Sequence, residues 1–256
     1  MFATNTRFTT FAKALVVSVS CLATVNINSA LAFTPTAYFL LQQLAQKRQS
    51  LNARDISAQF RTEIAGVDVP IEEYLYLKYP ERMRLISQYD HGEVIYIERE
   101  GKRVMQTEQQ VKKLTNAIDL TASLLVAAGK DIDQKAVRML KALKAAGIDT
   151  SIVAYGHLDD TIAYVIGARP FETDKPQVWL NQDTLQLLKT IIIDKEKPKA
   201  VVEMRFLDYG SPTGGDFLPA VIEVYRDGKL VRRAELSSLA INRSLPETLF
   251  DLPRLR

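Results

Sequence analysis

Few residues of this 256-residue chain have types and spacings suited to catalysis. The two histidines, His91 and His157, stand beside glycines in turn-like stretches. Each is a candidate general base or metal ligand or, alternatively, a surface residue of a turn. Neither has a second histidine or a cysteine at the spacing that zinc sites use. We therefore expect no catalytic metal and no cofactor.

Two pairs of adjacent carboxylates are the other candidates for acid and base chemistry, Glu72 with Glu73 and Asp159 with Asp160. Neighbouring residues of a strand point to opposite faces of a sheet, so Glu72 and Glu73 do not face a common substrate. The pattern favours a solvated strand edge for this pair and a solvated turn for the aspartates. Motifs for nucleotide binding and for a serine nucleophile are absent from the sequence, and we expect no enzyme activity.

The first 32 residues have the pattern of a secretory signal peptide. Arg7 and Lys13 are their only charged residues, residues 14–25 are mainly apolar, and Ala30-Leu31-Ala32 provides a small-x-small cleavage site. We expect cleavage after Ala32 and a mature periplasmic chain of residues 33–256. A membrane anchor is the alternative, although the apolar run is shorter than the ~20 residues that a span needs.

Cys21, the only cysteine, raises a second alternative, because a cysteine after an export segment can carry a lipid anchor. Such a site requires a large apolar residue three positions earlier, and Ser18 stands there. Cleavage after Ala32 removes Cys21, so the mature chain can form no disulfide and depends on its hydrophobic core.

Composition narrows the class of partner. The formal net charge of +3 falls by two when Arg7 and Lys13 are removed, and a near-neutral chain is a poor ligand for nucleic acid. Hydrophobic residues make up 47% of the sequence, which is enough for a substantial core. No apolar run after Phe33 is long enough to cross a bilayer. We also expect the chain to be a monomer.

Three segments have helical periodicity. Residues 36–49 begin after Pro35 and place leucines on one side; residues 108–128 and 133–146 follow a block of strands. Gly129 and Gly147 are suited to end the latter two, and Asp131 or Asp133 to cap the last. The basic side chains of residues 135–144 indicate a solvated helix face or a site for anionic lipid head groups or an acidic partner.

Alternating apolar and polar residues predict about 11–12 short strands. Asp227-Gly228 between two of them is suited to a type I′ hairpin turn. The expected strands are residues 59–64, 71–79, 82–88, 94–98, 104–106, 151–155, 161–168, 177–181, 185–194, 200–207, 218–226 and 229–241. We expect one α+β domain, a large curled antiparallel sheet with helices on its concave face.

One face of this sheet is expected to be apolar. Its members alternate with charged neighbours such as Arg61 and Glu203, and they are Phe60, Ile64, Met83, Leu85, Met204, Phe206, Ile222 and Val224. A curled apolar face is filled by helices, by side chains or by a ligand. Alternation by itself leaves open whether these residues line a cavity or an ordinary packed core.

The order of elements resembles the periplasmic lipoprotein-carrier family, also called outer-membrane lipoprotein-sorting proteins, of LolA-like and LolB-like type. The segments that carry the resemblance are ISAQF at 56–60, LKYPERMR at 77–84, and PQVWLNQDT at 176–184 followed by Leu188 and Lys189. The resemblance implies a half-open β-barrel under a helical lid, with the apolar face as the acyl-chain site. In this family a basic residue before a proline helps to couple release to lid movement, whereas Tyr79 precedes Pro80 here.

Two functions follow from these expectations. The first is a non-catalytic periplasmic carrier of a lipid or a lipidated protein, which exchanges cargo with a partner protein of the inner or outer membrane. The alternative is a periplasmic sensor or protein-interaction module on the same fold.

Overall fold

The computed structural model describes residues 34–78, 82–100, 102–114, 124–125, 131–194 and 200–253. The chain divides into two units, Met1–Phe33 and Thr34–Arg256, and every described residue belongs to the second. The predicted signal peptide, its cleavage site, Cys21 and Tyr79 therefore lie outside the described residues. Within the described part, no helix is long and apolar enough to cross a membrane.

Two helices closely match the predicted ones. Helix α1 spans Ala37–Ser50, and the Thr36 hydroxyl accepts a hydrogen bond from the Phe39 amide at 3.2 Å. Helix α3 spans Ile132–Ala145, and Asp131 caps it by accepting from the Gln134 amide at 2.7 Å. The cap is thus the first of the two aspartates that the sequence offered.

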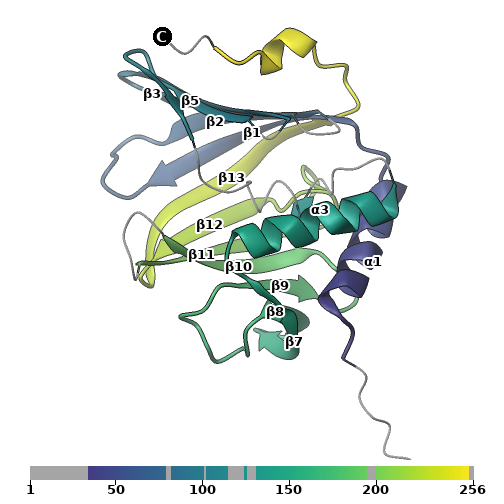
Figure 1. Cartoon of the computed structure of the whole chain (residues 1–256). Coiled ribbons are helices and arrows are strands. Elements are labelled where there is room, and N and C mark those ends of the chain that lie inside the picture. The colour runs from purple at the N-terminus through teal and green to yellow at the C-terminus, as the bar shows by residue number, and fades with distance from the viewer. Residues whose placement is uncertain are drawn as a thin grey trace, which may run out of the picture. The chain divides into compact units, whose positions relative to one another are not determined.

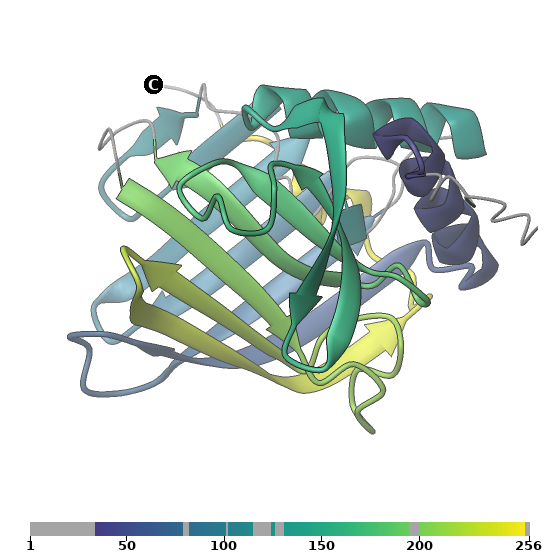
Figure 2. The same cartoon turned by 90° about the horizontal axis from the view of Figure 1, so that it is seen from below.

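The described strands form one antiparallel sheet, which Figure 2 shows as a continuous curved surface. Its 13 strands follow the order β6-β5-β4-β3-β2-β1-β13-β12-β11-β10-β9-β8-β7, so that β1 and β13 meet at its centre (Figure 1). The strands are β1 Asp55–Ile64, β2 Ile71–Lys78, β3 Arg82–Tyr89, β4 Gly92–Arg99, β5 Lys102–Gln106, β6 Val111–Lys113, β7 Asp149–Leu158, β8 Thr161–Gly167, β9 Gln177–Asn181, β10 Leu187–Asp194, β11 Ala200–Leu207, β12 Val221–Arg226 and β13 Lys229–Ile241.

The predicted helix over residues 108–128 is wrong at its start. Val111–Lys113 form β6, which pairs with β5 and is the strand that the prediction lacked. Pairing with β5 satisfies the backbone groups of this three-residue segment, and a periodicity read along the chain cannot register such a partner. Leu124 and Leu125 are helical and buried, and the rest of the predicted helix lies outside the described residues.

Turn chemistry decides several strand ends. Asp227 and Gly228 have φ angles of 47° and 77°, so the hairpin turn between β12 and β13 has the positive φ at both positions that type I′ requires. Leu185 has a φ of 56° and cannot extend a strand, and β10 accordingly begins at Leu187 rather than at residue 185. A short helix of 3₁₀ type, η1 (Glu247–Phe250), follows β13.

The main hydrophobic core joins helices and sheet. Leu40, Leu41 and Leu44 of α1 and Met139 and Leu143 of α3 are buried in one cluster with apolar side chains of the strands. The two helices also contact each other and β7. This packing fixes α1 and α3 to the same side of the sheet as the predicted apolar residues.

Candidate functional site: the apolar face of the sheet

The strand register assigns every strand residue to one of two faces, because directly opposed residues of an antiparallel pair share a face. Phe206 is opposite Ile222, and Met204 is opposite Val224. We call this side the apolar face. The residues that alternate with these along each strand belong to the opposite side, which we call the charged face. On it, Glu223 is opposite both Arg205 and Arg233.

All eight predicted site residues share the apolar face, as the register from β3 across β1 and β13 to β11 requires. Their burial differs. Phe60, Met83 and Phe206 are buried in the main core, and Met204 and Ile222 pack against it while half-buried. Ile64, Leu85 and Val224 are half-buried. The face is therefore a packed core in one part and accessible apolar surface in another.

The accessible part is broader than the predicted set. Leu75 and Tyr96 flank Leu85 on the neighbouring strands and are also half-buried. The half-buried apolar side chains of this face include Ile64, Leu75, Leu85, Tyr96, Met105, Ile192, Val202, Met204, Ile222 and Val224. An apolar surface that is neither solvated nor closed can receive a flexible hydrocarbon, and methionines suit such a surface because they repack readily.

Helix α1 is anchored to the sheet by its C-terminal turn. Arg48 is buried, donates to the carbonyl oxygen of Phe217 at 2.7 Å and lies over the Phe217 ring at 5.4 Å. Burial lowers the pKa of Arg48 and raises that of the neighbouring Tyr209, whose hydroxyl donates to the Leu187 carbonyl at 3.0 Å. These contacts fix one end of α1 against the loop after β11.

The link between the helices is more exposed. Asp133 at the start of α3 accepts from Gln42 Nε2 at 2.7 Å and from the Tyr38 hydroxyl at 3.2 Å. Desolvation and the adjacent Asp133 raise the pKa of Tyr38. Exposed hydrogen bonds of this kind contribute little to stability, so the polar contacts hold α3 to α1 less firmly than those that hold α1 to the sheet.

A polar cluster interrupts the apolar face near the hairpin ends of β1 and β2. Glu73 is 3% exposed and accepts hydrogen bonds from the hydroxyls of Thr62 at 2.6 Å and Ser87 at 2.7 Å. It also forms an ion pair with Arg232 of β13. We call Thr62, Glu73, Ser87 and Arg232 the Glu73 cluster. The expectation that Glu73 stands at a solvated strand edge is wrong: Glu72 and Glu73 do point to opposite faces, and the inner one is buried.

A pocket of about 320 Å³ adjoins this cluster. Its walls are the turn between β1 and β2 and the first residues of β13, and Arg232 belongs to both the pocket and the Glu73 cluster. The lining residues are Glu63, Ile64, Ala65, Val67, Asp68, Pro70, Leu230, Val231, Arg232 and Arg233. The pocket thus combines apolar residues such as Val67 and Leu230 with charged ones, of which Arg232 reaches the apolar face.

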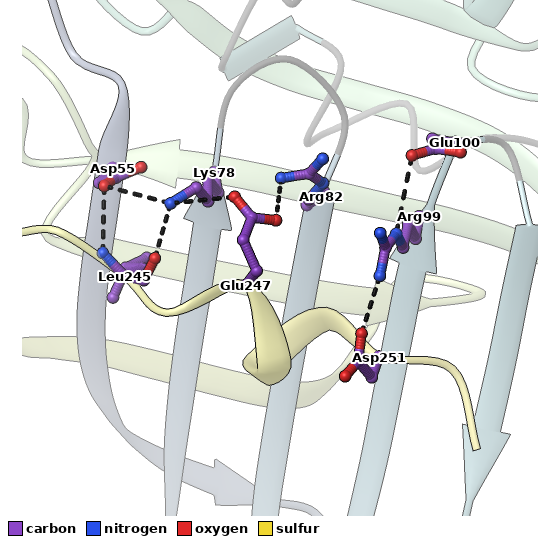
Figure 3. Close-up of polar contacts among 8 residues, drawn as sticks. All are labelled: Asp55, Lys78, Arg82, Arg99, Glu100, Leu245, Glu247 and Asp251. Carbon is purple, nitrogen blue, oxygen red and sulfur yellow. Dashed lines mark hydrogen bonds and ion pairs between the residues drawn. The ribbon is translucent and has the colours of Figure 1, made fainter.

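The charged face is covered at one end by the chain's own C-terminal segment, residues 245–251. Lys78 donates to the Leu245 carbonyl at 2.6 Å and pairs with Asp55 and Glu247, while Arg82 pairs with Glu247 (Figure 3). Arg99 pairs with Asp251 at 2.8 Å farther along. Lys78 is therefore part of this structural contact.

Both histidines are exposed. His91 is an exposed turn residue beside Tyr89, as one of the two expectations had it. His157 is also exposed, but it lies within β7 rather than in a turn. Asp159 and Asp160 form the exposed turn between β7 and β8, as predicted. No group of three or more potential metal ligands occurs among the described residues.

The sequence analysis missed Glu73 and Arg232 as a pair. A usable signal was present, because Ile71, Glu73, Leu75 and Leu77 alternate on one face and Glu73 occupies an apolar position. Its partner could not be identified from the sequence, since Arg232 is 159 residues away. The packing of the C-terminal segment on the sheet was missed as well, because the few apolar residues of this segment show no periodicity.

Comparison with known proteins supports the fold. No family model matches the sequence, and no curated protein matches it. A LolA superfamily protein from Nitrosomonas europaea matches with a TM-score of 0.54 and 16% identity over 85% of this chain and 98% of that one. A DUF1329 family protein from Desulfovibrio piger matches with a TM-score of 0.51 and 12% identity over the same shares. The predicted resemblance to the lipoprotein-carrier family is confirmed at the level of the fold.

Proposed function

We propose that this chain is a non-catalytic periplasmic carrier of a lipid or a lipidated protein. Acyl chains would lie against the apolar face, in contact with the half-buried residues around Leu85 and Val224, under a lid formed by α1 and α3. The single observation that carries this proposal is the row of apolar side chains that the described helices leave half-exposed. The fold shared with a LolA superfamily protein supports the same role.

The energetics of burial are sufficient for transport through water. Each methylene removed from water contributes about 0.8 kcal/mol. A sixteen-carbon chain that is fully sheltered therefore gains about 12 kcal/mol before the cost of ordering it. No covalent step is needed, and release follows when the lid opens or a better acceptor for the chain is present.

A change at Leu85 tests the proposal directly. Leu85→Glu places a carboxylate on the accessible part of the apolar face, where it meets water whenever the lid opens. We expect binding of a fluorescent acyl probe to fall by about tenfold or more, with little change in melting temperature. Val137→Glu is the matched control, because Val137 is an exposed residue of α3, and it should leave probe binding unchanged.

A different result would contradict the carrier. If the wild-type protein binds no acyl probe and Leu85→Glu unfolds it, the apolar face is an ordinary packed core. Native mass spectrometry after gentle purification provides an independent measurement, since a carrier should retain lipid.

The periplasmic location has its own test. Cleavage after Ala32 means that N-terminal sequencing of the exported protein begins at Phe33. A mature chain that begins at a lipidated Cys21 would overturn the soluble-carrier mechanism.

Sensing or protein interaction is the second candidate, and the open edge of the sheet favours it. Among the described residues β7 pairs with β8 alone, so the other edge of this ten-residue strand has no strand partner, and an extended segment of a partner would pair there. Tyr155 on this strand is exposed. An empty protein that captures a membrane partner, and loses it when β7 is interrupted by Ile152→Pro, would favour this role over carriage.

A further inference from the structure

The polar part of the apolar face indicates what kind of head group the cargo carries. Arg232 extends from β13 across β1 to reach Glu73 of β2. Its side chain therefore lies on the apolar face, next to its cross-strand partners Ile64 and Val224. An arginine between two accessible apolar residues is arranged to contact the polar end of an amphiphile.

The hydrogen-bonding capacity of Arg232 is incompletely used. A guanidinium has five N–H donors, and Glu73 accepts from Nη2. Its Nε is buried without a hydrogen-bond partner among the described residues. The Arg232 side chain is nevertheless 31% exposed, so an additional acceptor can approach it from the pocket.

The other charged residues of the pocket neither replace Arg232 as the cation for an anionic ligand nor strongly repel such a ligand. Arg233 is held on the charged face by Glu223 and Glu235. Glu63 and Asp68 are exposed, so water and salt screen their charges. Glu73 is the carboxylate that pairs with the Arg232 guanidinium in the described part of the chain, and it limits the attraction of this arginine for a ligand.

From this geometry we infer that the pocket beside Arg232 binds the anionic head group, a carboxylate or a phosphate, of an amphiphile whose tail lies along the apolar face. Arginine suits both groups because its planar donors match their oxygens. The inference rests on the proposed carrier function and adds the class of cargo and the residue that recognises it.

Competition with a bound fluorescent acyl probe tests the inference. The competitors are dodecanoate, dodecyl phosphate and the uncharged dodecyl maltoside, each below its micelle concentration. In the wild-type protein we expect the two anionic competitors to bind about tenfold more tightly than the maltoside. Dodecanoate and dodecyl phosphate together distinguish a carboxylate site from a phosphate site.

Two variants change the affinity in opposite directions. Glu73→Gln keeps hydrogen-bonding groups near Thr62 and Ser87 but frees Arg232, and should tighten binding of the anionic competitors several-fold. The double change Glu73→Gln with Arg232→Gln removes the cation and should abolish the preference for anions. Arg61→Gln is the matched control, because Arg61 is an exposed residue of β1 on the charged face, and it should change nothing.

The outcomes separate this inference from the carrier function. If all three competitors bind the wild type equally and neither variant changes their order, the head-group site is overturned while carriage stands. If the wild type binds no probe, both fail. Should the double variant not fold, Glu73→Gln still decides, because a loss or no change of anion binding contradicts the predicted tightening.

Discussion

The molecule contains two carboxylate-centred clusters that join distant parts of the chain, one on each face of the sheet. Glu73 ties β2 to Thr62, Ser87 and Arg232 on the apolar face, with its side chain 4% exposed. Glu247 ties the C-terminal segment to Lys78 and Arg82 on the charged face, with its side chain 56% exposed. Both make ion pairs, and only their burial differs greatly.

That difference separates what each cluster contributes to stability. Loss of one partner from a buried pair leaves an unpaired charge in a medium that cannot solvate it. An exposed pair is replaced by water at little cost. The ions around Glu247 therefore orient the C-terminal segment, while the buried side chain of Phe250 at the end of η1 removes apolar surface from water and stabilises the packing of the segment.

Removal of the Glu73 carboxylate should have the largest effect. Glu73→Ala leaves Arg232 and the hydroxyls of Thr62 and Ser87 without their acceptor, and we expect a loss of about 3 kcal/mol in the free energy of unfolding. Urea unfolding measures it. Glu73→Gln, which keeps an acceptor and adds a donor, should cost much less; equal losses for both variants would show that charge dominates over hydrogen bonding.

Phe250→Ala should have the next largest effect. Truncation of a buried phenylalanine to alanine lowers the free energy of unfolding by about 3 kcal/mol when the cavity cannot collapse. Because the end of a surface segment can relax, we expect a loss of about 2 kcal/mol here. Hydrogen exchange should show faster exchange at the C-terminal segment while the strands near Glu73 keep their protection. Global loss of protection would contradict this local role.

Glu247→Gln should have the smallest effect, a fall in melting temperature of no more than about 2 °C at neutral pH. A fall as large as that of Glu73→Ala would remove the distinction between the two clusters.

The same residue predicts a pH dependence of defined sign. Burial opposes the charged form, but the hydrogen bonds and charges of Arg82 and Lys78 outweigh it and hold the pKa of Glu247 below its ordinary value. The ion pairs thus stabilise the fold above the ordinary glutamate pKa of about 4.3, and this contribution is lost as the pH falls through the lowered pKa. We expect the difference in melting temperature between wild type and Glu247→Gln to vanish in that acidic range.

Much of the fold was predictable from local features. Alternation identified β9, β11 and β13 with their observed bounds, and Asp227-Gly228 predicted its turn. The eight apolar residues were placed correctly on one face, because a period of two fixes the face of every residue in a strand.

The sequence by itself determined most of the elements, the two faces and the order along the chain, because these depend on residues within a few positions of one another. Only the tertiary structure decided that Val111–Lys113 form a strand, that Glu73 is buried, and that residues 245–251 pack on the charged face. In each case the partner is a strand neighbour or a distant residue such as Arg232. The energy of such contacts depends on which residues lie opposite each other in the folded chain, and a local sequence pattern does not contain that pairing.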